Sequence, residues 1–410
     1  NEIEAYCFPG GVIQHLLREI GAGRPGLFTH SGLETFVDPR QQGGRCNERS
    51  REELVELLEI GGQEVLHYKP FKVNVGLIRG SFADTAGNLS PEEEAIDMDI
   101  HTIALAARNS GGVVIAQARR VVERGSLHPR HVRVPGVMVD AVVEAPEQEQ
   151  FYGLGYDATI SGGHRAHLGT VAAEIPAKLE RRIIARRAAL ELRDGASLNF
   201  GYGIPGGIFG VIAEQGGEDG FWMSVEQGTH NGRMLDGRLF GASRNTDAIV
   251  SSIEQFDYYS GGGIDITFLG MGEADEEGNV NVSHLGGNLI GPGGFIEIAQ
   301  NAKKVVFCGT FDAQGSKVEW AEGRLRVVQA GKVRKFVKQV ERITFSANYA
   351  RRRGQEVLYI TERAVFRLGE EGLELVEAAP GVDVERDILA AMEFRPRVGV
   401  VGAMLESVFV

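Results

Sequence analysis

Two stretches of this 410-residue chain share one pattern, Gly80-Ser-Phe-Ala-Asp84-Thr-Ala-Gly87-Asn88-Leu89 and Gly272-Glu-Ala-Asp275-Glu-Glu-Gly278-Asn279-Val280. Asp275 follows Asp84 by 191 residues. Asp, Gly and Asn also favour turns for local hydrogen-bonding reasons, so a chance likeness between two turns is the alternative. A second match lies downstream, where the residues around Asn109 resemble those around Asn301, 192 residues later. Two matches at nearly one separation predict a chain built from two related halves.

Within each half, short runs of β-forming residues alternate with stretches that carry helical patterning. The expected strands include 113–116, 264–269 and 304–308, and the expected helices include 96–108 and 295–302. This alternation is typical of open α/β sheets. A chain of 410 residues also exceeds the roughly 250–300 residues at which one core usually splits. The predicted fold class is therefore α/β, with two related open α/β domains.

The boundary between the halves is predicted from residues 144–167, which are rich in Gly and lack a sustained apolar period. A helix with a basic face is expected over 172–193. Residues 317–345 are expected to form an antiparallel excursion before strands at 357–361 and 364–368 return to the core. These expectations divide the chain into a first half of residues 1–150, a linker of 151–175 and a second half of 176–410.

Composition and charge narrow the classes of partner. The net charge of −13 repels phosphate backbones, and no Lys/Arg block interleaved with aromatic residues reverses it locally, so nucleic acid is not expected. No run of about 18 apolar residues predicts a membrane span. Cys7, Cys46 and Cys308 are odd in number and far apart, which argues against a disulfide framework and predicts a cytoplasmic protein. The sequence holds no metal-binding motif, so no metal site is expected.

Two glycine-rich loops are the best candidates for binding an anionic group, because backbone N–H groups must replace a positive field in so acidic a chain. The first, Gly201-Tyr-Gly203-Ile-Pro205-Gly206, lies between an expected strand at 197–200 and an expected helix at 207–215. The second, Gly286-Gly-Asn-Leu-Ile-Gly-Pro-Gly293-Gly294, runs into the second of the expected helices above. Its free N–H groups are suited to stabilising a negative oxygen.

Glu226 ends a strand expected at 221–225 and lies 20 residues after Gly206. A dinucleotide-binding domain places its ribose-binding acid at this position, so a nicotinamide-dependent dehydrogenase is one alternative. Pro205 in the tight turn, a short following helix and the Gln227-Gly228 pair after the acid weigh against it. A purely structural role for the glycines, with an ordinary exposed acid at the strand end, is the other alternative.

An ordered series of short motifs extends through the second half and is specific as a set. The series is Ser224-Val-Glu226-Gln-Gly228, Phe240-Gly-Ala-Ser-Arg244-Asn245, Gln255-Phe-Asp257, Gly261-Gly-Gly-Ile-Asp265, Gly278-Asn-Val-Asn281, Gly291-Pro-Gly-Gly294 and Ala299-Gln-Asn301-Ala. Together with Gly32–Arg40 in the first half and Ile360–Phe366 near the end, these motifs resemble the family I coenzyme A transferases, and within them the propionate/acetate CoA-transferase type. The resemblance covers nearly the whole chain and implies the duplicated CoA-transferase/NagB-like fold.

The resemblance implies roles for the matched residues. Glu226 stands at the position of the catalytic glutamate, and Gly294 matches the residue whose backbone N–H is assigned to the oxyanion hole. The other candidates for binding coenzyme A or the oxyanion are Gly293, Gly201, Gly203 and Asn281. Coenzyme A is expected as a co-substrate, without a metal or a permanently bound cofactor. The expected partners are acyl-CoA, small carboxylic acids and further copies of the chain, in a homodimer or homotetramer.

The chain departs from the family pattern at three places. Val225 and Gln227 flank the acid where the stricter motif reads Ser-Glu-Asn-Gly, and Pro9-Gly10-Gly11 stands where the family has Pro-Gln-Gly. The family's first strand and glycine loop are expected to lie before residue 1. We therefore expect the first half to be incomplete at its N-terminus.

A carboxylate suits CoA transfer because it is already ionised, with an ordinary pKa of about 4.3. Attack of Glu226 on an acyl-CoA thioester gives an acyl-glutamyl anhydride and CoA thiolate, and the thiolate then forms a glutamyl-CoA thioester. Both intermediates hydrolyse, so we expect Glu226 in a closed cleft between the halves. The open alternatives are an acyl-CoA hydrolase on the same scaffold, the nicotinamide dehydrogenase, and a sugar-phosphate sensor or isomerase-like module that does not need Glu226.

Overall fold

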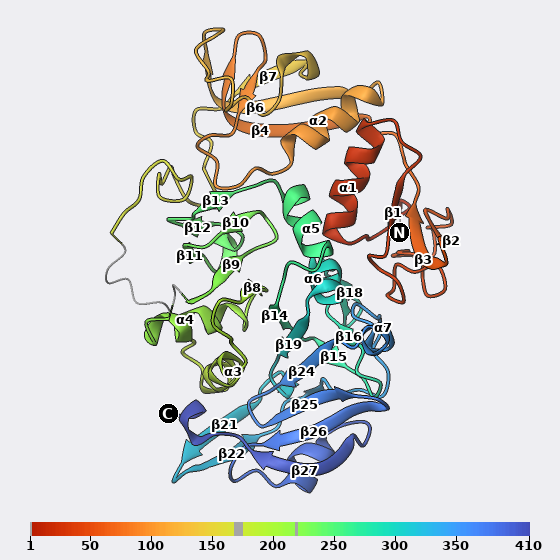
Figure 1. The fold of residues 1–410 in the computed structure, drawn as a ribbon, viewed down its shortest axis with the longest axis vertical. Coiled ribbons are helices and arrows are strands. Elements are labelled where there is room, and N and C mark those ends of the chain that lie inside the picture. Colours follow the sequence, from red (N-terminus) through yellow and green to blue (C-terminus); the bar gives the residue numbers. More distant parts are fainter. Residues whose placement is uncertain (1, 168–174, 218–219) are drawn as a thin grey trace.

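The computed structural model describes residues 2–167, 175–217 and 220–410, and each half has its own sheets (Figure 1). The first half consists of α1 Gly10–Gly21, β1 Leu27–Thr29, β2 Val55–Ile60, β3 Gln63–Tyr68, β4 Val75–Asp84, β5 Leu89–Ser90, α2 Ile100–Asn109, β6 Val113–Val122 and β7 Ala141–Glu144. The helices of the second half are α3 Leu179–Ala189, α4 Gly206–Glu214, α5 Ser252–Ser260, α6 Phe295–Asn301 and α7 Ala347–Arg352. Its main-sheet strands are β8 Ser197–Phe200, β9 Trp222–Ser224, β10 Thr229–His230, β13 Ala248–Ile249, β14 Ile266–Gly270, β19 Lys304–Cys308, β24 Glu356–Ile360, β25 Ala364–Gly369, β26 Gly372–Ala378 and β27 Arg397–Ala403. Its short accessory strands are β11 Arg233–Met234, β12 Ser243–Arg244, β15 Glu273–Ala274, β16 Val280–Asn281, β17 His284–Leu285, β18 Asn288–Leu289, β20 Asp312–Ala313, β21 Lys317–Ala321, β22 Arg324–Gln329 and β23 Val333–Arg334.

A ten-stranded sheet organises the second half, in the order β13-β10-β9-β8-β14-β19-β24-β25-β26-β27. The strands β9, β8, β14, β19 and β24 run parallel to one another. In β19, Val305 and Phe307 belong to the core that contains α5 and α6, whereas Val306 and Cys308 belong to the core that contains α3 and α4. Because helices cover both faces of this part of the sheet, its central strands are continuous apolar runs.

The first half carries a four-stranded sheet, β5-β4-β6-β7, and a separate three-stranded sheet, β1-β3-β2. Helix α2 covers one face of the four-stranded sheet, where Ala104 packs with Ile78 and Val114. On the opposite face, Leu77 is 70% exposed and Val113 is 47% exposed. The described part of the chain thus covers one face of this sheet and leaves apolar side chains of the other face at the surface.

The repeat recurs in the strand pairing. Val75 of β4 pairs with Val113 of β6 in the first half, and Ile266 of β14 pairs with Lys304 of β19 in the second. Ile266 follows Val75, and Lys304 follows Val113, by 191 residues. The strands are therefore related by a separation of 191 residues, whereas Asn109 and Asn301, the last residues of α2 and α6, are separated by 192.

The hairpin turns of the two halves are closed by the same hydrogen bonds. The backbone N–H of Asp84 donates to the carbonyl of Asn88 at 2.9 Å, and that of Asp275 donates to the carbonyl of Asn279 at 3.1 Å. Each aspartate carboxylate accepts the N–H of the corresponding asparagine, at 3.0 Å and 2.9 Å. Likeness in both the turns and the sheets they join supports duplication over a chance match of turn residues.

Two helices are shorter than the sequence predicted. Helix α2 begins at Ile100 instead of residue 96, because Met98 and Asp99 have left-handed φ angles of 58° and 51° that interrupt a right-handed helix. Helix α3 spans Leu179–Ala189 instead of 172–193. After Ala189 the N–H groups of residues 190–192 donate to the carbonyls three residues before them, a tighter turn that ends the α-helix. Residues 172–174 of the prediction lie outside the described residues.

The segment expected to be a linker, 151–175, is partly packed against the second half. Ile160 is fully buried and belongs to a small apolar cluster with Leu235 and Ala242. Residues 168–174 of the expected linker lie outside the described residues. The preceding part therefore has a core contact of its own instead of only spanning the gap between the halves.

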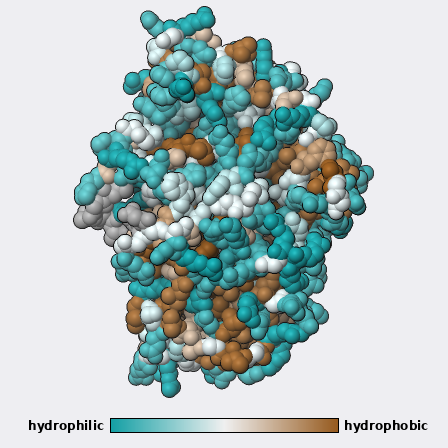
Figure 2. Space-filling model, in the orientation of Figure 1, coloured by the Kyte–Doolittle hydropathy of each residue, from teal (hydrophilic) through white to brown (hydrophobic). Residues whose placement is uncertain are grey.

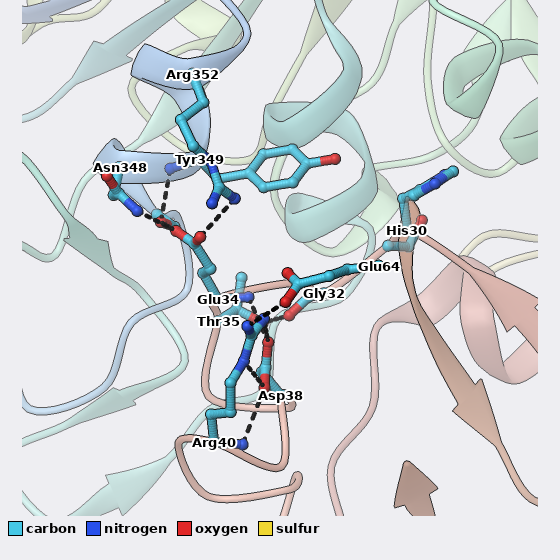
Figure 3. Close-up of polar contacts among 12 residues, drawn as sticks. His30, Gly32, Glu34, Thr35, Asp38, Arg40, Glu64, Asn348, Tyr349 and Arg352 are labelled. Atoms are coloured by element: carbon cyan, nitrogen blue, oxygen red, sulfur yellow. Dashed lines mark hydrogen bonds and ion pairs between the residues drawn. The ribbon is translucent and has the colours of Figure 1, made fainter. Parts of the chain in front are cut away.

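One loop of the first half docks onto the second half through Glu34, which Asp38 of the same loop holds in place (Figure 3). Glu34 has a left-handed φ of 61°, and its carboxylate accepts hydrogen bonds from Ser346 Oγ at 2.9 Å and Asn348 Nδ2 at 3.0 Å. Asp38 is fully buried and accepts hydrogen bonds from the Glu34 N–H at 2.8 Å and from Arg40 Nη2 at 2.7 Å. Asp38 thus holds Glu34 in the strained conformation that lets it reach the other half.

Replacing Asp38 by asparagine is expected to lower the free energy of unfolding by about 1–3 kcal/mol at pH 7. The new amide NH₂ group would face the N–H donors of Glu34 or Arg40, where the carboxylate accepted hydrogen bonds. Burial alone would raise the pKa of Asp38, but hydrogen bonds from Arg40 and from the Glu34 N–H outweigh burial and lower this pKa. The stabilisation is present above the ordinary aspartate pKa and is lost as pH falls through the lowered one.

Urea unfolding of the wild type and of Asp38→Asn, from pH 7 down through the lowered pKa of Asp38, measures the difference between their free energies of unfolding. This difference is expected to narrow as pH falls. The exposed Asp236, replaced in the same way, is the control. A constant difference at every pH would contradict the assignment.

The face of the molecule seen in Figure 2 is largely hydrophilic, and hydrophobic patches gather in its lower part, over the last strands of the second half. On the edge strand β27, Val400 is 99% exposed. Across residues 2–167, 175–217 and 220–410, every helix is too short or too polar to cross a bilayer.

Candidate active site

Glu226 lies just beyond the carboxyl end of β9. This strand runs parallel to β8, with Ser224 in register with Asn199, and β8 in turn pairs with β14. Ligand sites of open α/β sheets lie at the carboxyl edge of the parallel strands. The fold therefore places Glu226, whose side chain is half-buried, at the edge where such sites are found.

The Glu226 carboxylate faces the second glycine-rich loop. The backbone N–H of Gly294 donates a hydrogen bond to Oε2 at 3.1 Å, and Gln227 Nε2 donates to Oε1 at 3.4 Å. An ideal Cβ on Gly294 would lie 2.3 Å from Oε2, and one on Gly293 would lie 3.6 Å from Oε1. Only a residue without a side chain therefore allows the backbone at Gly294 to approach the carboxylate so closely.

Burial raises the pKa of Glu226 to about 7, although the Gly294 N–H favours the ionised form and opposes the shift. The carboxyl group therefore exists as a mixture of charged and neutral forms near neutral pH. A carboxylate at this position can act as a nucleophile, and the N–H donor beside Oε2 can stabilise a negative oxygen at the same atom.

The first half reaches this loop through the start of α1. The N–H of Gly10 donates to the carbonyl of Gly293 at 2.6 Å. Glu297, in the first turn of α6, accepts the N–H of Val12 at 2.8 Å and is only 1% exposed. Burial raises the pKa of Glu297 to about 8, with the nearby Glu226 charge adding to the shift and backbone N–H donors opposing it. Sequence reasoning missed Glu297, although an acid one turn after the glycine loop was a usable signal.

A buried polar network lies under the end of β9. Tyr259, from α5, donates from its hydroxyl to Ser224 Oγ at 3.0 Å and accepts from Asn199 Nδ2 at 3.1 Å. Thr267 Oγ1 donates to Asn199 Oδ1 at 3.0 Å. These four side chains are at most 3% exposed. The sequence had given no sign of this network, because its members are spread over three strands and a helix.

The first glycine-rich loop lies at the same sheet edge but has other contacts. Gly201 donates its N–H to the carbonyl of Phe268 at 2.8 Å, and Gly203 has a left-handed φ of 87°. The ring of Tyr202 contacts the ring of Phe240 edge to face, with centroids 5.7 Å apart. Neighbours of this loop thus include Phe268 and Phe240, whereas the Glu226 carboxylate accepts its hydrogen bonds from Gly294 and Gln227.

Asn281 has a structural role in this conformation that the sequence did not predict. Its side chain is fully buried and accepts the N–H groups of Ser283 and His284, at 3.1 Å and 3.2 Å. Its Nδ2 donates to Glu273 Oε2 at 2.9 Å and to the His284 carbonyl at 2.6 Å. Two acceptor and two donor positions of the amide are thus used by its own turn and by Glu273 of β15.

No group of three or more His, Cys, Asp or Glu side chains able to hold a metal ion occurs in the described ranges of the chain. Around Glu226 lie the Gly294 N–H, the Gln227 amide and the Phe256 ring, with the buried acid Glu297 nearby. The N–H and amide groups fit the binding of an anionic or carbonyl oxygen.

Comparisons of the sequence agree with this geometry. A family model described as coenzyme A transferase matches residues 1–145. The acetate CoA-transferase YdiF of Escherichia coli O157:H7 is 44% identical over 397 residues, which cover 97% of this chain and 74% of that protein. The caffeate CoA-transferase of Acetobacterium woodii is 43% identical over 406 residues, which cover 97% of this chain and 77% of that protein.

Comparisons of the structure give the same result. The apoenzyme of the acyl-CoA transferase YdiF from Escherichia coli O157:H7 matches with a TM-score of 0.94 at 43% identity, over 100% of this chain and 78% of that one. A thioester complex of that enzyme with CoA matches with a TM-score of 0.92 at 42% identity, over 100% of this chain and 77% of that one. The chain therefore belongs to the coenzyme A transferases, enzymes that move coenzyme A between an acyl-CoA and a carboxylate.

Proposed function

We propose that Glu226 is the nucleophile of this transferase and that the chain exchanges coenzyme A between short-chain acids such as acetate and propionate. The observation that carries the proposal is the placement of the Glu226 carboxylate against the Gly294 N–H at the carboxyl edge of the sheet. The two oxygens of the carboxylate have different neighbours, so they are suited to different tasks.

In the first step, Oε1 of Glu226 attacks the thioester carbonyl carbon of acyl-CoA. The C–S bond breaks, CoA leaves as a thiolate, and an acyl-glutamyl anhydride forms. The thiolate then attacks the side-chain carbonyl carbon of Glu226. The anhydride C–O bond breaks, the first acid leaves as a carboxylate, and a glutamyl-CoA thioester remains. An acceptor carboxylate passes through the same steps in reverse and leaves as the new acyl-CoA.

Oε2 remains the carbonyl oxygen of Glu226 in both intermediates. When the thiolate attacks, this oxygen takes up the negative charge, and the Gly294 N–H already points at it from 3.1 Å. A donor in place before the charge develops needs no reorganisation during the reaction. Gly293 and Gly294 are therefore proposed as the oxyanion loop, and Gly201 and Gly203 as a CoA-binding loop at the same sheet edge.

Steady-state kinetics with acetyl-CoA and propionate test the proposal. Formation of propionyl-CoA with ping-pong kinetics supports a covalent route, because acetate must leave before propionate enters. Free CoA as the sole product would contradict the transferase assignment and indicate an acyl-CoA hydrolase. Caffeate belongs in the acceptor panel, since one relative is a caffeate CoA-transferase.

The rate is expected to depend on pH through Glu226. Only the carboxylate form attacks, and burial raises its pKa to about 7, so kcat/KM for acyl-CoA should rise with pH and level off above about pH 8. Because Glu297 lies nearby, the apparent pKa belongs to the pair of acids. A profile of kcat/KM that stays flat from about pH 5.5 to 8 would contradict this assignment.

We also propose a division of the chain into two halves and a connection. We assign residues 1–150 to the first half, 151–175 to the connection and 176–410 to the half that carries Glu226. The homodimer or homotetramer and the cytoplasmic location remain predictions from the sequence. The Glu226 carboxylate is turned toward the Gly294 N–H. This arrangement supports a nucleophile beside an oxyanion donor over the nicotinamide dehydrogenase or the sugar-phosphate sensor.

A further inference from the structure

The strand that precedes Glu226 is short. β9 has three residues, Trp222–Ser224, and pairs with β10 at Ser224 and His230. Backbone hydrogen bonds flank this pair, from the Val225 N–H to the Thr229 carbonyl at 3.1 Å and from the Asn231 N–H to the Met223 carbonyl at 2.8 Å. The other neighbour of β9 is β8, which pairs with it over the same three residues. So short a strand end needs side-chain contacts to fix the residues that follow it.

Tyr259 supplies such a contact from the helix layer. Its hydroxyl donates to Ser224 Oγ at 3.0 Å, and Ser224, the last residue of β9, lies two residues before Glu226. Glu226 lies in the turn that follows β9, and its carboxylate accepts the N–H of Gly294, the residue before α6. Asn199 completes the link by donating to the Tyr259 hydroxyl at 3.1 Å and to the Ser224 carbonyl at 3.2 Å.

Tyr259 is also close to Glu226 in space. Burial raises the pKa of the Tyr259 hydroxyl well above its usual value, and the negative charge of Glu226 adds to the shift. The Tyr259 ring packs edge to face on Phe256, with centroids 6.0 Å apart. Phe256 in turn lies against Gly294, where an ideal Cβ would be 2.6 Å from Phe256 Cζ. The same helix therefore touches the strand that precedes the acid and the loop that faces it.

We propose that Tyr259 is a positioning residue for the transfer reaction, which fixes the end of β9 through Ser224 so that the Glu226 carboxylate stays in line with the Gly294 N–H. The proposal rests on the proposed function, in which Glu226 is the nucleophile. Tyr259 itself touches neither substrate nor reacting atoms. Its effect comes through the strand, since a shift of about 1 Å at a reacting group costs on the order of 100-fold in rate.

The test is Tyr259→Phe, which removes only the hydroxyl and keeps the ring in place. The expected result is a kcat lower by about 10- to 100-fold with the KM for acetyl-CoA within about twofold of wild type. Tyr258→Phe is the matched control. Tyr258 precedes Tyr259 on α5, and its hydroxyl donates to the Gly263 carbonyl at 2.6 Å and contacts Ser197 Oγ, at the start of β8, at 2.9 Å. This control is expected to keep the wild-type kcat.

Ser224→Ala supplies a second, independent variant with the same expected loss of kcat. In the double variant the two losses should overlap instead of multiplying, because both substitutions remove the hydrogen bond between Tyr259 and Ser224. A Tyr259→Phe enzyme with wild-type kcat would overturn the proposal, as would full additivity of the two changes. Mapping of the covalent intermediate in the wild type separates this failure from that of the proposed function: label on Glu226 with an unaffected Tyr259→Phe rejects the positioning role alone.

Discussion

Replacing Glu226 by glutamine is expected to lower kcat for propionyl-CoA formation by about 10⁴-fold or more, the scale seen when a nucleophile is removed from an enzyme that uses one. The amide has the shape of the acid and can keep the hydrogen bond from Gly294. It cannot, however, attack the thioester. The loss should therefore appear in kcat, and binding of acyl-CoA should change little.

Glu319→Gln is the control for this change, since Glu319 is exposed on β21, far along the chain from the sheet edge that carries Glu226. Initial rates at saturating acetyl-CoA and propionate measure the effect. A Glu226→Gln enzyme that retains a tenth or more of the wild-type kcat would remove Glu226 from the role of nucleophile.

Replacing Gly294 by alanine is expected to lower kcat by about 10²–10³-fold, the cost of losing one oxyanion donor. The reason is steric, because an ideal Cβ at this position lies 2.3 Å from Glu226 Oε2 and 2.6 Å from Phe256 Cζ. The methyl group must push the carboxylate away from the N–H. The backbone has a φ of −86°, which alanine tolerates, so the effect does not come from strain at residue 294.

Gly155→Ala is the matched control, since among the described residues no atom lies within 4 Å of an ideal Cβ at Gly155. Thermal unfolding of both variants separates a loss of rate from a loss of folded protein. A Gly294→Ala enzyme with unchanged kcat and an intact fold would show that this loop does not stabilise the reacting oxygen.

The duplicated fold could be predicted because it depends on patterns that are local in sequence. The Asp84 and Asp275 turns carry their own hydrogen-bonding residues, and β19 is a continuous apolar run, so both were visible before the structure. The start of α2 could not be predicted, because Met98 and Asp99 are residue types that a right-handed helix accepts. Contacts with the rest of the fold give them left-handed φ angles. Such angles are set by tertiary structure and leave no mark on the composition.

The candidate site was only partly predictable for the same reason. The sequence and its family resemblance brought Glu226 and Gly294 forward, and the structure places their atoms 3.1 Å apart. Asn281 matched a family motif, and its amide donates to Glu273 of β15 and to the His284 carbonyl of its own turn. Tyr259 was missed because its link to Ser224 spans 35 residues, and the local pattern of α5 contains nothing that distinguishes it from Tyr258.

Mass spectrometric mapping of the covalent intermediate tests the central claim most directly. The wild-type enzyme would be incubated with acetyl-CoA without an acceptor acid, treated with hydroxylamine, and digested to peptides. Hydroxylamine attacks an activated acyl group, so the intermediate is expected to leave a hydroxamate on the side chain of Glu226 and on no other residue. A hydroxamate on a different residue would contradict the mechanism. So would the absence of a hydroxamate in an enzyme preparation that forms propionyl-CoA when propionate is added.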